Sequence, residues 1–180
     1  MKYADEDPQD ERVRDVLERL PEPRINLFRM LANAPALIGP TLRLGQTILT
    51  GSDLDPEIRE LVILHTARVT QADYEWTQHE QIARLVGVSE EKIETVARGD
   101  LGGCFDEREG LALRLADEVL RDGAAGVEVV AEAESTLGRA ELIEVLLVTG
   151  YYAMLAGVMR SVELDIDDVV EKGMLEGGAR

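Results

Sequence analysis

The sequence predicts an all-α fold, a single compact helical domain of roughly seven or eight helices over residues 1–180. Apolar residues recur at helical spacing and make up 45% of the 180 residues, which is enough for a hydrophobic core. No alternating apolar and polar run is bounded by a hairpin turn, so strand signals are nearly absent. No linker is long enough to mark a domain boundary.

Prolines divide the first third of the chain into short helices. Pro21 and Pro23 end a charged amphipathic segment at about residues 10–19, and a short helix follows at about 24–33. Pro35 and Pro40 punctuate the next segment, which we expect to run as helix to about Thr50.

The middle of the chain carries the clearest helix signals. We expect Asp55 to cap a helix that has Pro56 at its first position and ends near Val69. Because this helix is apolar nearly all round, it should lie in the centre of the domain. The stretch TQAD breaks it, and a second helix follows over about residues 73–86, with Gly87 as its C-cap.

We expect Ser89 to cap the next helix and Asp106 to cap the one after it, at residues 107–121. Two more helices are expected at about residues 127–137 and 140–160. The last one contains the longest apolar run, residues 142–159, which approaches the length of a membrane span. Glu144 and two glycines interrupt the run. We therefore expect a buried helix, in the core or at a subunit interface, and no membrane span.

The charge of the chain is strongly unbalanced, with 19 Lys and Arg against 36 Asp and Glu and a net charge of −17. Such a chain repels nucleic acid and anionic membrane surfaces, so we expect neither as a partner. Cys104 is the single cysteine and the N-terminus has no signal peptide, which favours a cytoplasmic location. We expect residues 1–9 and 165–180 to be mobile acidic ends.

Residues 72–81, ADYEWTQHEQ, combine the only Trp of the chain with one of its two His residues. On a helix, His79 lies in the middle of the apolar, inward face, and Glu75 lies one turn before it. The opposite face, which includes Gln78, is polar. Burying Glu75 and His79 is costly unless they are paired, so they form a satisfied structural pair or a proton-transfer site.

Glu60 is a candidate third member of this site. It lies in the apolar helix upstream, where a carboxylate needs a specific partner, and the break at TQAD is expected to fold the two helices together. Tyr74 and Trp76 are placed to wall a small pocket. Arg59 and His65 carry a weaker signal for function, and an exposed or interface position is the default for each.

Residues 59–96, RELVILHTARVTQADYEWTQHEQIARLVGVSEEKIETV, closely resemble the core of the carboxymuconolactone decarboxylase family, which includes the alkyl hydroperoxidase D-like proteins. The likeness is looser over residues 24–160. It implies a compact all-α fold of the alkyl hydroperoxidase D-like type and a homo-oligomer, as a dimer, trimer or hexamer. The matching features are Arg59-Glu60, Tyr74-Glu75-Trp76 followed by His79, Gly87, and the helix start at residues 89–93.

The peroxidase branch of this family carries a Cys-x-x-Cys-x-x-x-His motif with a Glu twelve residues before the first Cys. His79 and Glu60 match the His and the Glu, but Ala72 and Glu75 occupy the two Cys positions. Without a thiolate there is no nucleophile to attack a peroxide. Cys104 lies far along the chain and does not restore the spacing.

The decarboxylase branch needs no thiol. The resemblance then implies a cofactor-independent lyase acting on a small carboxylated lactone or β-keto-acid-like substrate, with Glu60, Glu75 and His79 as catalytic residues. In this hypothesis His79 is the acid/base, Glu75 orients and polarises it, and Glu60 tunes the site or shuttles a proton. We expect no cofactor and no metal, since one His without a thiolate is a weak zinc site.

Two alternatives stay open. The first is an alkyl hydroperoxidase D-like peroxidase or other oxidoreductase that acts without the redox cysteines. The second is a non-catalytic oligomeric binding protein, in which the polar cluster holds helices in register. Side chains sealed from solvent with every partner satisfied favour the binding protein, whereas a pocket of roughly 300 Å3 or more favours the enzyme.

Overall fold

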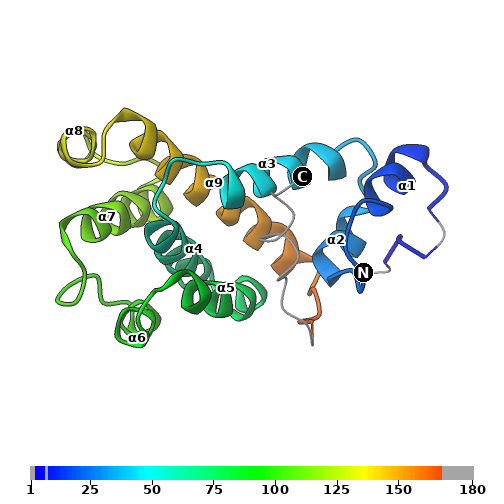
Figure 1. Ribbon diagram of the computed structural model, residues 1–180, viewed down its shortest axis with the longest axis horizontal. Helices are drawn as coiled ribbons and strands as arrows, with labels where there is room; N and C mark the ends of the chain where they lie inside the picture. The colour runs from blue at the N-terminus through cyan, green and yellow to red at the C-terminus, as the bar shows by residue number, and fades with distance from the viewer. Residues whose placement is uncertain (1–2, 7, 168–180) are drawn as a thin grey trace. The chain divides into compact units, whose positions relative to one another are not determined.

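The computed structural model describes residues 3–6 and 8–167, and over these residues it contains α-helices and no β-strand (Figure 1). The prediction of an all-α fold is confirmed. Nine helices form in this part of the chain, slightly more than the seven or eight predicted. They are α1 Glu11–Leu17, α2 Asn26–Leu31, α3 Ile38–Thr50, α4 Pro56–Thr70, α5 Asp73–Val86, α6 Glu90–Arg98, α7 Glu107–Asp122, α8 Val127–Thr136 and α9 Arg139–Ser161.

The chain divides into two compact units. The second unit is the continuous segment Ser52–Val158, and the first combines the residues before it with those after it. Helix α9 starts in the second unit, and its last three residues belong to the first. The prediction of one domain over the whole chain therefore stays a prediction.

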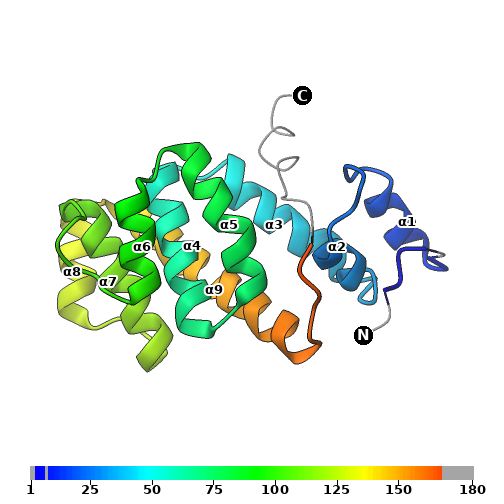
Figure 2. The same cartoon turned by 90° about the horizontal axis from the view of Figure 1, so that it is seen from below.

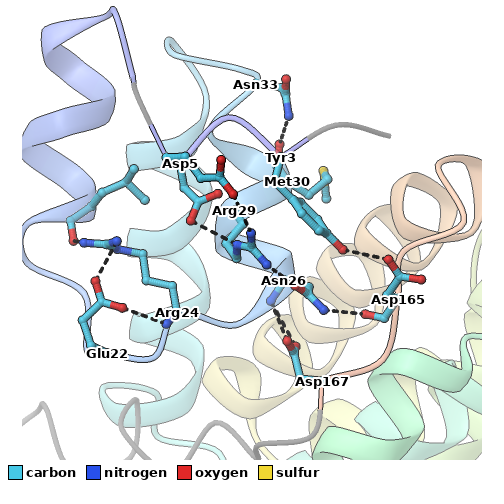
Figure 3. Close-up of polar contacts among 12 residues, drawn as sticks. Tyr3, Asp5, Glu22, Arg24, Asn26, Arg29, Met30, Asn33, Asp165 and Asp167 are labelled. Atoms are coloured by element: carbon cyan, nitrogen blue, oxygen red, sulfur yellow. Dashed lines mark hydrogen bonds and ion pairs between the residues drawn. The ribbon is translucent and has the colours of Figure 1, made fainter.

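In the first unit, α1 packs against α3, and polar contacts join the two ends of the chain (Figure 3). The Tyr3 hydroxyl donates to the Asp165 carboxylate at 3.3 Å. The backbone amide of Asn26 donates to the Asp167 carboxylate at 2.9 Å. The predicted mobile ends also include residues 1–2, 7 and 168–180, which lie outside the described residues.

In the second unit, α4 is the central helix and packs against α5, α6 and α7 (Figures 1 and 2). All ten residues from Ile58 to Ala67 are buried. The apolar pattern predicts a central helix, but the expected exposed or interface position of Arg59 and His65 is wrong, because α4 is enclosed by its neighbours. Asp55 caps the helix by accepting from the Glu57 amide at 2.8 Å, and Pro56 stands in the first turn. The helix stops at Gln71, whose left-handed backbone (φ +56°) turns the chain into α5.

Glu144 is a charged residue inside the long apolar run of α9, and its hydrogen bonds explain its place there. Its carboxylate accepts from the amides of Asp53 at 3.1 Å and Leu54 at 2.7 Å, and so fixes the loop in front of α4. By length and composition α9 is the one helix among the described residues that could cross a membrane. Half of its most apolar window is buried within the protein.

Candidate active site around His79

Helix α5 carries Glu75 and His79 on its buried face, where helical spacing places them. Their exposed fractions are 3% and 4%. Gln78 was expected on the polar face but is only 2% exposed. It lies three residues after Glu75 and four before Ile82, so it shares their face, and α5 buries a wider arc than the apolar residues alone indicate.

Glu60 of α4 meets His79 directly. Its Oε2 lies 2.7 Å from His79 Nδ1, and the Glu60 side chain is completely buried. The packing of α4 against α5 brings these two residues together, as the break at TQAD suggests. In the tautomer with its hydrogen on Nδ1, the ring donates this bond to Glu60, and the bond fixes the orientation of the imidazole.

Arg59 is the second partner of Glu60. Its Nε donates to Glu60 Oε1 at 3.0 Å, and its side chain is 5% exposed. The default position that the sequence suggests for Arg59, exposed or at an interface, is therefore wrong. A buried carboxylate is stable as an anion when it has a cation and further hydrogen bonds, and Glu60 has both.

Glu75 faces the other ring nitrogen. Its Oε2 lies 3.5 Å from His79 Nε2, which is ion-pair distance but long for a hydrogen bond. Its Oε1 is buried and has no hydrogen-bond partner. Burial raises the pKa of Glu75 to about 7, and the negative charge of Glu60 adds to the rise while His79 opposes it. Glu75 therefore keeps its proton far closer to neutral pH than an ordinary Glu does.

The contacts of the two carboxylates with the ring are not the ones that the sequence-based hypothesis suggests. Glu60, and not Glu75, makes the short bond that orients the imidazole. Glu75 instead sits at the Nε2 side, with a raised pKa and a free oxygen. The arrangement is a continuous row from Arg59 through Glu60 and His79 to Glu75, along which a proton can be held or passed.

The ring of Tyr152 completes the surroundings of His79. It comes from α9 and meets the imidazole edge to face, with centroids 4.9 Å apart and ring planes at 86°. Tyr151 packs on Tyr152 in the same manner at 5.2 Å. The sequence offered no signal for this contact, because Tyr152 lies inside a long apolar run far along the chain.

Trp76 lines a cavity of about 330 Å3 in the second unit, whereas the predicted second wall, Tyr74, is 5% exposed and does not line it. The cavity is formed by residues of α4, α5 and α6 together with Gln71, and the side chains of Glu60, Glu75 and His79 are not part of its wall. The polar row and the pocket therefore share no side chain, although α5 contributes residues to both.

The other candidates for redox or metal chemistry lie elsewhere. Cys104 is a free, partly exposed thiol in the loop between α6 and α7, whereas α4 and α5 carry the polar row. Within residues 3–6 and 8–167, no group of three or more His, Cys, Asp and Glu side chains is arranged to hold a metal ion.

The fold is that of the alkyl hydroperoxidase D-like proteins. An uncharacterized peroxidase-related protein from Ralstonia eutropha JMP134, with an alkylhydroperoxidase AhpD core, superimposes with a TM-score of 0.71 at 16% identity, covering 87% of this chain and 84% of that one. A protein of unknown function from Agrobacterium tumefaciens gives a TM-score of 0.69 at 14% identity, covering 77% and 96%. An uncharacterized peroxidase-related protein from Silicibacter sp. TM1040 gives 0.69 at 14%, covering 81% and 80%.

One family model matches the sequence. The carboxymuconolactone decarboxylase family model matches residues 35–118, a region that includes α4, α5 and the whole row from Arg59 to His79. Over these residues the chain is similar to the carboxymuconolactone decarboxylase family. No curated protein matches the chain. The predicted family resemblance is therefore confirmed.

Proposed function

We propose that this protein is a cofactor-independent enzyme of the decarboxylase type, which moves protons at His79 during reaction of a small carboxylated lactone or β-keto-acid-like substrate. The observation that carries the proposal is the position of His79 between Glu60 on Nδ1, at 2.7 Å, and Glu75 facing Nε2, at 3.5 Å. A row of this kind holds the imidazole in one orientation and leaves its Nε2 side for proton exchange.

The chemistry requires an acid at this place. When a substrate carboxylate leaves as CO2, the electron pair of the broken C–C bond stays on carbon and must accept a proton. His79 supplies it from Nε2, and Glu75, with its pKa of about 7, returns a proton to the ring near neutral pH. Arg59 donates to Glu60 Oε1 and so holds the carboxylate whose other oxygen faces Nδ1.

Peroxide reduction is the alternative function that similarity to peroxidase-related proteins suggests. Their thiol chemistry requires a nucleophile beside the His, and Ala72 and Glu75 stand at those two positions. Loss of peroxide reduction in a Cys104→Ser variant would support this alternative.

A non-catalytic role has one observation in its favour. Glu60, Glu75 and His79 are all buried, with exposed fractions of 0 to 4%, so substrate must displace part of the wall to reach Nε2. The unpaired Oε1 of Glu75 argues the other way, because a purely structural cluster gains stability by satisfying each buried polar atom.

The test is a His79→Gln variant with His65→Gln as the matched control, assayed for CO2 release on panels of carboxylated lactones and β-keto acids. We expect His79→Gln to lose at least about 100-fold in kcat/KM, the contribution of a positioned acid or base. His65→Gln should keep turnover within about threefold of the parent protein. Equal turnover in both variants, or no turnover of any panel member by the parent protein, contradicts the proposal.

A further inference from the structure

We propose that the cavity between α4, α5 and α6 is a binding pocket for a small, planar monocarboxylate, which Arg68 recognises by its charge and Trp76 by its flat face. The pocket is separate from the polar row and does not depend on His79 being catalytic. Its volume of about 330 Å3 lies at the lower end of small-molecule sites. Its lining residues are Ala67, Arg68, Gln71, Asp73, Trp76 and Ala97.

The guanidinium of Arg68 is fixed at the end of α6. Its Nε donates to the Ala97 carbonyl at 3.2 Å and its Nη2 to the Arg98 carbonyl at 3.4 Å. Gly99 makes this position possible, because a Cβ on that residue would lie 1.9 Å from Nη2. The cation is therefore held in place before any ligand arrives, which lowers the entropic cost of binding.

Arg68 is the one basic residue of the second unit, Ser52–Val158, that has no carboxylate within ion-pair distance. The other eight all form ion pairs. In a chain with 36 acidic and 19 basic residues, an unpaired arginine needs a reason. Its Nη1 makes none of the hydrogen bonds described above, and an Arg that lines a cavity with a free N–H is suited to bind a carboxylate.

The rest of the wall favours a flat and small ligand. Trp76 is half-buried and also packs on the alanine cluster of Ala67, Ala72 and Ala156. This packing fixes the indole, and a fixed indole offers a face for stacking. Ala67 and Ala97 have small side chains that leave space beside the indole, and this space suits a planar ring better than a bulky group.

Asp73 sets the charge of the ligand. It lines the same pocket, is exposed, and forms no ion pair with Arg68. The pocket wall therefore carries one positive side chain, Arg68, and one negative side chain, Asp73. A ligand with a second negative charge would be repelled by Asp73. This arrangement favours a monocarboxylate over a dicarboxylate.

Trp76 reports on binding, because it is the single Trp of the chain. The probe is benzoate, titrated against Trp76 fluorescence and by isothermal titration calorimetry, with uncharged benzamide as the matched ligand. We expect saturable binding of benzoate that weakens with added salt, and at least about tenfold weaker binding of benzamide. Equal affinity of the two ligands, or no saturable binding of benzoate, overturns the proposal.

Four variants locate the site. Arg68→Gln should weaken benzoate at least about tenfold, whereas Arg98→Gln, whose side chain pairs with Glu94 and does not line the pocket, should not. Asp73→Asn should tighten it by about two- to fivefold, since it removes the opposing charge. Ala97→Leu should abolish it by filling the cavity from an exposed position.

The variants also cover the case in which Arg68→Gln fails to fold, because Ala97→Leu leaves the Arg68 bonds to backbone carbonyls in place. Unchanged benzoate affinity in a folded Arg68→Gln or in Ala97→Leu overturns the proposal. A His79→Gln protein should bind benzoate as the parent does. Failure of the proposed catalytic function would therefore leave this result unaffected, and loss of benzoate binding in that variant would contradict a separate pocket.

Discussion

The two histidines of the chain share many features and differ in what surrounds their second ring nitrogen. Both lie in the second unit and are nearly sealed from solvent, at 1% for His65 and 4% for His79. Each has a carboxylate on one nitrogen. His65 Nε2 lies 3.1 Å from Asp117, whose other oxygen binds Arg121 at 3.0 Å.

The second nitrogen makes the difference. His65 Nδ1 is buried without a hydrogen-bond partner, and burial lowers the pKa of His65 although Asp117 opposes the shift. In contrast, both nitrogens of His79 face carboxylates. A buried imidazole can pass a proton from one carboxylate to another only when both of its nitrogens face one, and of the two histidines His79 meets this condition.

The largest effect should come from removing the charge that anchors His79. A Glu60→Gln change leaves Arg59 buried without an anion, and we expect it to reduce the free energy of unfolding by about 3–5 kcal/mol. Asp117→Asn should cost only about 1 kcal/mol, because Asp117 is 16% exposed and Asn keeps an acceptor for His65. Urea unfolding followed by circular dichroism measures both. Equal losses would mean that the two carboxylates play the same structural role.

Much of this comparison follows from local sequence, and part of it does not. The period of 3.6 residues places Glu75 and His79 on one buried face, and the helix break before α5 folds Glu60 towards them. The same reasoning does not say which ring nitrogen each carboxylate meets. That depends on the relative rotation of α4 and α5, and the structure places Glu60 at Nδ1 and Glu75 at Nε2.

The sequence does not predict contacts between residues that lie far apart along the chain. Tyr152 meets His79 only because α9 packs in the second unit, and nothing in its own surroundings distinguishes it from other apolar positions of that helix. Arg59 is buried because α4 is enclosed on nearly every side, including the flank where a charge would normally find solvent. Its place directly before Glu60 was the one available signal.

The next effect concerns pH and Glu75. The folded state raises the pKa of Glu75 from 4.5 to about 7, so the folded protein binds more protons than the unfolded chain between these values. Stability from this group is therefore present below about pH 4.5 and is lost as the pH rises to about 7. We expect Glu75→Gln to be more stable than the parent by up to about 3 kcal/mol at pH 8.

The same variant should show little of this gain at pH 4, where Glu75 is protonated and Gln resembles it. Chemical unfolding at both pH values makes the measurement, and Glu80→Gln, on the same helix and partly exposed, is the control. A Glu75→Gln protein that is less stable than the parent at pH 8 would show that the ionised carboxylate is stabilised by His79 and that the burial of Glu75 does not dominate.

The smallest effect tests the other histidine and has the opposite sign. Because the pKa of His65 is lowered from 6.5 in the folded state, the unfolded chain binds more protons below that pH. Stability from this group is present above about pH 6.5 and falls as the pH decreases. His65→Gln should therefore make the acid side of the stability profile shallower, by less than Glu75→Gln changes the neutral side. An acid side that becomes steeper would mean that Asp117 stabilises the imidazolium, and that the unpartnered Nδ1 does not decide the behaviour of His65.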